Sequence, residues 1–398
     1  MSREEQKPLR VGVVARLTEP GGVQSVALSM IKGLNSRGIV PDVLWDVKPS
    51  ESLLASAGVR AGFRRVWFPF STFLIDKMPL SVRYLAFLAN SVDGNRFRGE
   101  YDFAFTVNQI FVFPEDFPHL YYLSGPPLLP QLDLPPPGIK GVPLAAFKWM
   151  YRTFWRKRRP IYDYQPGSTF VINSHYTARL FKEAHGIELP VVHPPINLSG
   201  RSFEPGDLSR RDSLVFFSRI VYYKRPEMVM DLARRHRNLR CVIMGGVQPH
   251  RRPYYEELRT RSEKEGLGIV FIDNPSDRQV RDELARARFY VFPAHNEHFG
   301  MTTPEAIASG AIPFVHNSGG QVEIVNDDRL RFEDSDFLQK FNALVGTSDR
   351  ELESIRGRLA VHVRKYSEDN FIAEMLQYLD RAVAPAGTTE QKGVPHPA

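Results

Sequence analysis

Residues 297–315 read EHFGMTTPEAIASGAIPFV, and the rest of the C-terminal half is organised around this stretch. Its Thr-Thr-Pro-Glu segment is typical of a helix start. Thr303 can cap the helix, and Pro304 lacks an N–H that the first helical turn leaves unpaired in any case. Gly310 then favours the end of the helix. The stretch therefore predicts a glycine-containing turn followed by a short helix.

Two glutamates, Glu297 and Glu305, lie eight positions apart on either side of this turn. The backbone amides between them and the helix dipole favour an anion surrounded by hydroxyl groups. The spacing alone carries little information, because Glu257 and Glu265 share it on a segment expected to be helical. A strand-to-helix turn with two solvated carboxylates is the alternative.

Length and composition indicate a globular chain with two domains. The chain has 398 residues, of which 42% are apolar and 24% are charged, enough for two ordinary cores. No run approaches the ~18–20 apolar residues that a membrane span requires. The net charge of +7 favours an acidic partner, which could be nucleic acid, anionic lipid or a phosphorylated small molecule.

The termini and the cysteine content indicate a cytoplasmic protein. Residues 1–8 are polar and lead directly into a strand, so no secretory signal is expected. Cys241 is the one cysteine, which excludes an internal disulfide and fits a reducing cytosol. Residues 385–398 have the composition of a disordered tail.

The N-terminal half predicts alternating strands and helices. A valine-rich strand, the loop containing Gly21 and Gly22, a helix that Gly38 ends and a second strand form a βαβ unit. A proline-rich segment, residues 124–143, is expected to be irregular. The predicted strands cover residues 9–15, 41–47, 101–107, 119–123 and 170–174, and a further helix covers 176–185.

The C-terminal half restarts the alternation after a polar linker. The predicted strands are residues 213–217, 240–244, 269–272, 288–292 and 312–315, with helices at 226–236, 254–265, 277–287 and 304–309. We therefore expect an N-terminal domain over 1–198 and a C-terminal domain over 199–366. An amphipathic helix over 367–384 is expected to pack back on the N-terminal domain. The fold class is α/β, with two doubly wound Rossmann-like domains facing across a cleft.

The string from Glu297 to Val315 closely resembles the nucleotide-sugar signature of GT-B glycosyltransferases, particularly the large retaining family 4 group. The resemblance implies that Glu297 contacts the donor sugar and that Glu305 holds the ribose hydroxyls. It further implies that the intervening segment meets the phosphates and the sugar, chiefly through its backbone amides. This segment comprises His298, Phe299, Gly300, Met301 and Thr302.

A second motif, residues 218–226, follows the first strand of the C-terminal half and reads SRIVYYKRP. Arg219 and Lys224 can both reach the cleft, where they would stabilise charge on a departing diphosphate. The family shows Gly-Arg and Lys-Gly here, whereas Ser218 and Arg225 stand in place of the two glycines. The alternative is a pair of solvated surface cations.

Other glycines complete the resemblance. Gly21 and Gly22 match a family loop whose amides close over the donor diphosphate or the acceptor, and Gly245 begins a turn that could border the base. Residues 316–323 (HNSGGQVE) resemble a segment of mannosyltransferases that extend dolichol-linked oligosaccharides. The family histidine that faces the sugar has no match, since Ser124 stands at the corresponding strand end.

Residues 144–159 read LAAFKWMYRTFWRKRR and contain no acidic residue. On a helical wheel the apolar side chains form one face and the basic side chains cluster beside it, which predicts a helix lying in an anionic membrane surface. Such a helix would suit a lipid-linked acceptor. A core-packed helix with a basic solvent face is the alternative, and no motif indicates nucleic-acid binding.

The resemblance implies a retaining hexosyltransferase that uses a GDP- or UDP-sugar and a glycan or lipid-linked acceptor, in the cytoplasm or on the cytoplasmic face of a membrane. No metal or other cofactor is expected, because the sequence contains no Asp-x-Asp motif and no histidine–carboxylate cluster at ligand spacing. Three rivals stay open. They are a nucleotide-sugar epimerase of the same fold, a retaining phosphorylase, and a degenerate membrane-associated binding protein.

Overall fold

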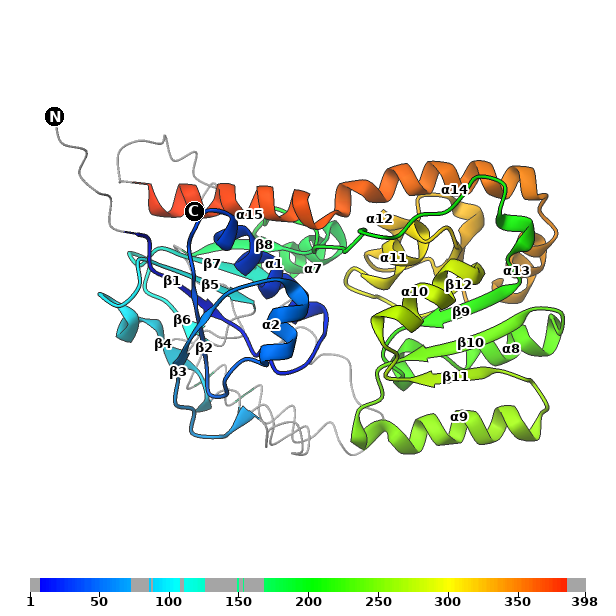
Figure 1. Cartoon of the computed structure of the whole chain (residues 1–398), viewed down its shortest axis with the longest axis horizontal. Coiled ribbons are helices and arrows are strands. Elements are labelled where there is room, and N and C mark those ends of the chain that lie inside the picture. Colours follow the sequence, from blue (N-terminus) through cyan, green and yellow to red (C-terminus); the bar gives the residue numbers. More distant parts are fainter. Residues whose placement is uncertain are drawn as a thin grey trace. The chain divides into compact units, whose positions relative to one another are not determined.

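The structure is a computed structural model that describes residues 8–72, 89–107, 111–125 and 168–384, together with Ala86, Trp149 and Thr153. The chain divides into two compact units. The N-terminal unit comprises residues 1–173, 177–195 and 369–398, and the C-terminal unit comprises residues 174–176 and 196–368. Each unit contains a six-stranded parallel sheet with its own core (Figure 1).

The sheet of the N-terminal unit has the order β3-β2-β1-β5-β7-β8. Its central strands are short, apolar and almost completely buried, as expected for a parallel sheet covered on both faces. The strands are β1 (Val11–Val14), β2 (Asp42–Trp45), β3 (Gly62–Arg65), β5 (Phe103–Val107), β7 (His119–Leu123) and β8 (Thr169–Ile172), with a separate pair β4 (Val92–Asp93) and β6 (Phe111–Val112).

Four α-helices accompany this sheet in the described residues. They are α1 (Gly22–Ser36), α2 (Glu51–Ala57), α7 (His175–His185) and α15 (Glu368–Val383), with a 3-10 turn η1 (Gly94–Phe97). Helix α15 comes from the end of the chain, yet Phe371 and Met375 lie in the same core cluster as Met30 of α1. A Cβ on Gly33 would lie 2.8 Å from the Ile372 side chain, so the two helices pack closely.

The sheet of the C-terminal unit repeats the same topology, with the order β11-β10-β9-β12-β13-β14. All its neighbouring strands run parallel. From β9 the chain adds β10 and β11 on one side of the sheet, and it then returns to place β12, β13 and β14 on the other side. Strands β9 and β12 are therefore neighbours at the point where the strand order reverses. Its strands are β9 (Ser213–Phe217), β10 (Arg240–Gly245), β11 (Val270–Asp273), β12 (Ala287–Phe292), β13 (Ile312–His316) and β14 (Arg331–Phe332).

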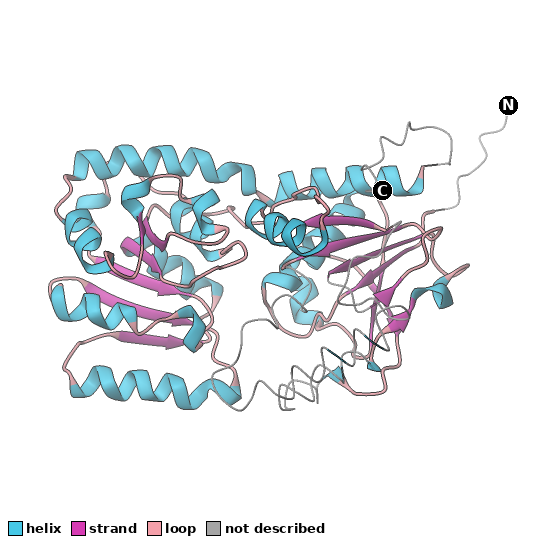
Figure 2. Ribbon diagram, turned by 180° about the vertical axis from the view of Figure 1, so that it is seen from behind, coloured by secondary structure: helices cyan, strands magenta, loops and turns pink. Residues whose placement is uncertain are grey.

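Helices surround this second sheet, and Figures 1 and 2 show α9 and α14 at opposite sides of the unit. The α-helices are α8 (Met228–Arg235), α9 (Arg252–Lys264), α10 (Asp277–Arg286), α11 (Thr302–Ala308), α12 (Gln321–Ile324), α13 (Phe337–Val345) and α14 (Asp349–Val363). The 3-10 turns are η3 (Leu208–Arg210), η4 (Tyr222–Lys224), η5 (Pro249–Arg251), η6 (Asp328–Leu330) and η7 (Arg364–Tyr366).

The predicted strands and helices are present with ends shifted by at most a few residues. One detail is wrong. Helix α11 begins at Thr302 and Met301 precedes it without a side-chain cap, while the hydroxyl of Thr303 donates a hydrogen bond to Gln321 Oε1 at 3.0 Å. The pattern did not identify helices α2, α13 and α14.

Several predictions fall outside the described residues. These are the irregular segment 124–143 beyond Gly125, the amphipathic segment 144–159 apart from Trp149 and Thr153, and the tail 385–398. None of the helices in the described part of the chain combines the length and apolar character that crossing a membrane requires.

Candidate functional site

The predicted site residues of the C-terminal unit gather at the carboxyl ends of β9 and β12. These strands are neighbours in the sheet although three helices and two strands separate them in sequence. Open parallel sheets bind ligands at this kind of switch point, where the loops from the two strands diverge. The topology therefore brings the loop 218–227 and the loop 293–301 together.

Lys224 and Glu297 form an ion pair across this switch point. The Lys224 side chain is 9% exposed and the Glu297 side chain is 20% exposed. The Lys224 ammonium also lies 5.2 Å from the centre of the Phe292 ring, within range of a cation–π contact. Lys224 and Glu297 are thus not the solvated surface groups of the alternative interpretation. Arg219 is exposed, and among the described residues it makes no ion pair.

Arg225 occupies the position where the resembled family has a glycine, and its backbone has the left-handed conformation that glycine favours (φ 58°). Its side chain explains how an arginine is tolerated there. The guanidinium lies 2.7 Å from Asp334 Oδ1 and donates to the Pro293 carbonyl at 3.2 Å. The loop therefore keeps its backbone path without the glycine.

Gly245 supports the same loop from β10. Its φ is 156°, and a Cβ at this position would lie 1.6 Å from the Ser218 carbonyl oxygen. The next residue, Gly246, accepts a hydrogen bond from the Ile220 amide at 2.9 Å. Gly245 is therefore required for the close approach of two backbones. Contact between Gly245 and a base stays a prediction.

The turn after Glu297 rests on the two glycines that follow β13. A Cβ on Gly319 would lie 2.3 Å from the Glu297 carbonyl oxygen, and one on Gly320 would lie 2.3 Å from that of His298. The Gly320 amide donates to the Glu297 carbonyl at 2.7 Å. Gly300 itself has a φ of 92°. The glycines of residues 316–323 thus approach the site backbone.

Three side chains between the two glutamates have packing or hydrogen-bond partners within the C-terminal unit. Phe299 is buried and its ring packs against Tyr366, and Met301 packs against the same core. The Thr302 hydroxyl lies 2.6 Å from the hydroxyl of Tyr290. Contact between this segment and a ligand is therefore expected from its backbone amides.

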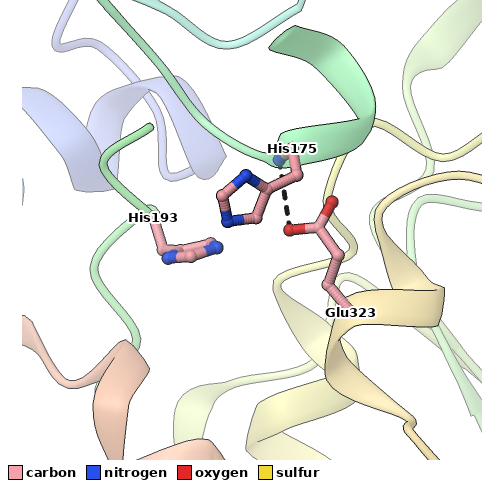
Figure 3. Close-up of side chains that lie close together, drawn as sticks. All are labelled: His175, His193 and Glu323. Atoms are coloured by element: carbon pink, nitrogen blue, oxygen red, sulfur yellow. Dashed lines mark hydrogen bonds between the residues drawn. The ribbon is translucent and has the colours of Figure 1, made fainter. Parts of the chain in front are cut away.

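The His298 carbonyl accepts a hydrogen bond from Ser174 Oγ at 2.6 Å. Glu323 accepts a hydrogen bond from the His175 amide at 3.1 Å (Figure 3). It also accepts one from the Tyr176 amide at 2.8 Å. A carboxylate at the first turn of α7 satisfies amides that the helix leaves unpaired. Glu323 thus has a structural role that its sequence motif did not indicate.

Glu305 lies in the first turn of α11, as predicted, and pairs with Arg201 at 3.0 Å. The two side chains are 20% and 11% exposed. Burial raises the pKa of Glu305, and the charge of Arg201 opposes that rise. Arg201 also donates to Ser309 Oγ at 3.2 Å. Sequence reasoning missed Arg201, because no motif distinguishes it within the polar linker.

The structure also brings together His295, His316 and Asp334, which are distant in sequence. The sequence has no such cluster at ligand spacing, and these three residues come together only in three dimensions. Gly21 and Gly22 belong to the N-terminal unit. They follow β1 at the start of α1, and Gly21 accepts a hydrogen bond from the Ser25 amide at 2.8 Å.

Residues 202–338 match the family described as Glycosyl transferases group 1. The "GDP-Man:Man(3)GlcNAc(2)-PP-Dol alpha-1,2-mannosyltransferase" of Dictyostelium discoideum is 27% identical over 228 residues, which is 50% of this chain and 44% of that protein. The "D-inositol 3-phosphate glycosyltransferase" of Jonesia denitrificans is 29% identical over 216 residues, 50% of each chain. This chain thus spans about half the length of these curated relatives.

Solved structures resemble the fold over most of the chain. The Anabaena protein Alr3699/HepE in complex with UDP and glucose has a TM-score of 0.65 and 15% identity, covering 94% of this chain and 99% of that one. WaaG, "a glycosyltransferase involved in lipopolysaccharide biosynthesis", has a TM-score of 0.62 and 14% identity, with coverages of 94% and 99%. The prediction of the GT-B fold is confirmed, as is the resemblance to the mannosyltransferases.

Proposed function

We propose that this GT-B chain transfers a hexose from a nucleotide-diphosphate sugar to an acceptor hydroxyl. The observation that carries the proposal is a pair of largely buried ion pairs, Lys224–Glu297 and Arg201–Glu305, whose carboxylates come from the turn before α11 and from the first turn of α11. Both pairs lie within or next to the segment that matches the glycosyl transferase family. The donor would be held mainly by the C-terminal unit.

The chemistry can be assigned to groups of this chain. Lys224 and Arg219 would neutralise the charge that develops on the leaving diphosphate, together with the amides at the start of α11. Because Lys224 is largely buried, its charge acts in a low dielectric and is screened less than a surface charge. The pair with Glu297 holds the ammonium in place before the donor arrives.

Transfer would proceed with retention of configuration. The bond between the anomeric carbon and the diphosphate oxygen breaks, the acceptor oxygen bonds to the same face of that carbon, and the leaving diphosphate takes the acceptor proton. Glu297 would orient the sugar and Glu305 the ribose hydroxyls. In this scheme the protein cations neutralise the diphosphate, so transfer should continue in the presence of a chelator.

We propose GDP-mannose as the donor. The name of the Dictyostelium relative includes GDP-Man, whereas the similar Anabaena structure contains UDP and glucose. A thermal-shift screen against GDP-, UDP- and ADP-sugars tests this choice. A ligand at 100 times its dissociation constant stabilises a protein by about 2.7 kcal/mol, which such a screen detects. A shift with UDP-sugars alone would contradict the proposed base.

A lipid-linked acceptor is the proposal for the second substrate. Its support is the basic, amphipathic sequence of residues 144–159 and the name of the Dictyostelium relative, which includes a PP-Dol oligosaccharide. The chain should float with anionic liposomes, and less so after residues 156–159 are neutralised. Equal flotation of both proteins would refute binding through residues 156–159, and absence of flotation of the unaltered chain would refute membrane association.

A binding protein that has lost catalysis is the second candidate, favoured by Ser218 and Arg225 in place of two glycines. The left-handed backbone of Arg225 argues against it, because the loop keeps the conformation that glycine favours. Calorimetry that detects no nucleotide-diphosphate binding would favour this candidate. An epimerase would instead convert the donor without any acceptor, which proton NMR would reveal.

A further inference from the structure

Three adjacent strands of the C-terminal sheet each present one metal-ligating side chain at the carboxyl edge. His295 follows β12, His316 is the last residue of β13, and Asp334 follows β14. One ligand atom from each of these residues lies within 4.8 Å of the others. This arrangement is invisible in the sequence, where the three residues are 18 or more positions apart.

The spacing of these atoms suits a tetrahedral transition metal. Asp334 Oδ1 lies 3.2 Å from His295 Nε2 and 3.7 Å from His316 Nε2. Ligands bonded to zinc at about 2.0–2.2 Å in a tetrahedron are about 3.3–3.6 Å from each other. The present separations bracket that value, so small side-chain rotations would complete the geometry.

The surroundings of His316 resemble those of a metal-ligating imidazole. Its Nδ1 lies 2.8 Å from Ser318 Oγ, and Ser318 Oγ accepts the Asn296 amide at 2.8 Å, which orients the ring. The His316 side chain is 8% exposed, so the site has a largely buried ligand on one side.

We propose that His295, His316 and Asp334 form a binding site for a divalent transition metal of the zinc class. Glu333, whose carboxylate lies 3.8 Å from His316 Nε2, or a water molecule would take the fourth position. This site lies beside the donor loop, because His295 is two residues from Glu297.

Arg225 is the internal competitor for this site. Its guanidinium lies 2.7 Å from the same Asp334 oxygen and contacts His295 Nε2. A bound metal must displace the Arg225 guanidinium from Asp334 and His295. The backbone of Arg225, which is left-handed and follows Lys224, then loses the contacts that hold it. We infer that metal occupancy inhibits sugar transfer by freeing the Lys224 loop. This second step rests on the proposed function, whereas metal binding does not.

The test is titration of the full chain with Co²⁺ after removal of metals by a chelator, monitored by its visible ligand-field absorption. Calorimetry with Zn²⁺ gives the stoichiometry. One equivalent should bind. Asp334→Asn or His295→Ala should weaken binding by at least about 10–100-fold, the loss that mutation of an outer-shell partner of a ligand already causes. Both side chains are at least 44% exposed, so the fold should tolerate these changes.

Arg225→Gly should bind the metal more tightly than the wild type, because it removes the competitor and suits a φ of 58°. Asp282→Asn is the matched control, since its side chain is 67% exposed on α10, outside the cluster. Its metal affinity should equal that of the wild type.

Absence of binding to the wild type, or equal binding by Asp334→Asn and His295→Ala, would overturn the site. Binding without inhibition of transfer would overturn the coupling to Lys224 alone. A preparation with no transfer activity that still binds one Co²⁺ through Asp334 would support the site and count against the proposed function.

Discussion

The ammonium of Lys224 is paired with the carboxylate of Glu297, 73 residues further along the chain. The pair forms because β9 and β12 are neighbours at the point where the strand order reverses. It places a largely buried cation at the carboxyl ends of these two strands, where it would stabilise an anionic leaving group.

Lys224→Ala should reduce sugar transfer about 10²–10³-fold, the effect of removing one group that stabilises transition-state charge. The variant also leaves Glu297 unpaired in a mostly buried position, so its thermal stability should fall. Transfer of radiolabelled sugar and thermal denaturation measure the two effects separately.

The double variant Lys224→Ala/Glu297→Gln is the control, because it removes the unpaired charge. Its stability should recover while its transfer rate stays low. Recovery of both would show that Lys224 only balances the charge of Glu297 and would refute its role toward the diphosphate.

Glu305→Gln should weaken nucleotide binding about tenfold or more, since hydrogen bonds to a charged group contribute roughly 1.5–3 kcal/mol. Arg201→Ala should act by changing the pKa of Glu305. Burial raises this pKa, and the positive charge of Arg201 lowers it. Removing Arg201 raises that pKa further, so nucleotide affinity should fall more steeply with decreasing pH than in the wild type. Calorimetry with the nucleotide diphosphate between pH 8 and 5 gives both results, and parallel pH profiles would exclude this role of Arg201.

Gly319→Ala should destabilise the C-terminal unit and weaken donor binding. The new Cβ would lie 2.3 Å from the Glu297 carbonyl oxygen, at a φ of 74° that costs a further ~1–2 kcal/mol for an L-residue. Gly357→Ala is the control, since its Cβ meets nothing within 4 Å on α14. Alanine there should stabilise the protein by about 1 kcal/mol. Urea unfolding compares the two, and equal stability would contradict the packing described for Gly319.

The buried Arg356 predicts a pH dependence of stability. Its side chain is 0% exposed and lies 2.5 Å from Asp207, which also pairs with Arg211 at 2.9 Å. Burial alone would raise the pKa of Asp207, but hydrogen bonds from Arg211 and Arg356 outweigh it and lower the pKa below 3.8. The ionised carboxylate is thus favoured in the folded state, so its contribution is present above pH 3.8 and lost as pH falls through the lower folded value.

Asp207→Asn should therefore lower the free energy of unfolding at pH 7 by about 1–3 kcal/mol, the range for charge-assisted hydrogen bonds. As the pH falls below 3.8, its difference from the wild type should shrink. Urea unfolding at a series of pH values measures this change, with Asp282→Asn as an exposed control. A constant difference across the series would contradict the lowered pKa of Asp207.

The local pattern predicted most of the secondary structure correctly because buried parallel strands and amphipathic helices have distinct apolar periods. Strands β7 and β9 match the predicted ranges at both ends. The predicted start of α11 was wrong, because the Thr303 hydroxyl donates to the Gln321 side chain and does not cap the helix. The sequence pattern did not predict helix α14. Its apolar residues can be recognised as one face only once they are seen to pack in the core of the C-terminal unit.

The sequence by itself determined the two doubly wound units, the glycine-containing turn and the presence of Glu297, Glu305, Arg219 and Lys224, because these depend on local pattern and motif. Only the tertiary structure decided which charges meet. Arg201 pairs with Glu305, and Arg225 pairs with Asp334 and contacts His295. The physical reason is that strand order, unlike strand identity, depends on long-range packing. The carboxyl edge of the sheet therefore unites residues whose spacing in the chain carries no signal.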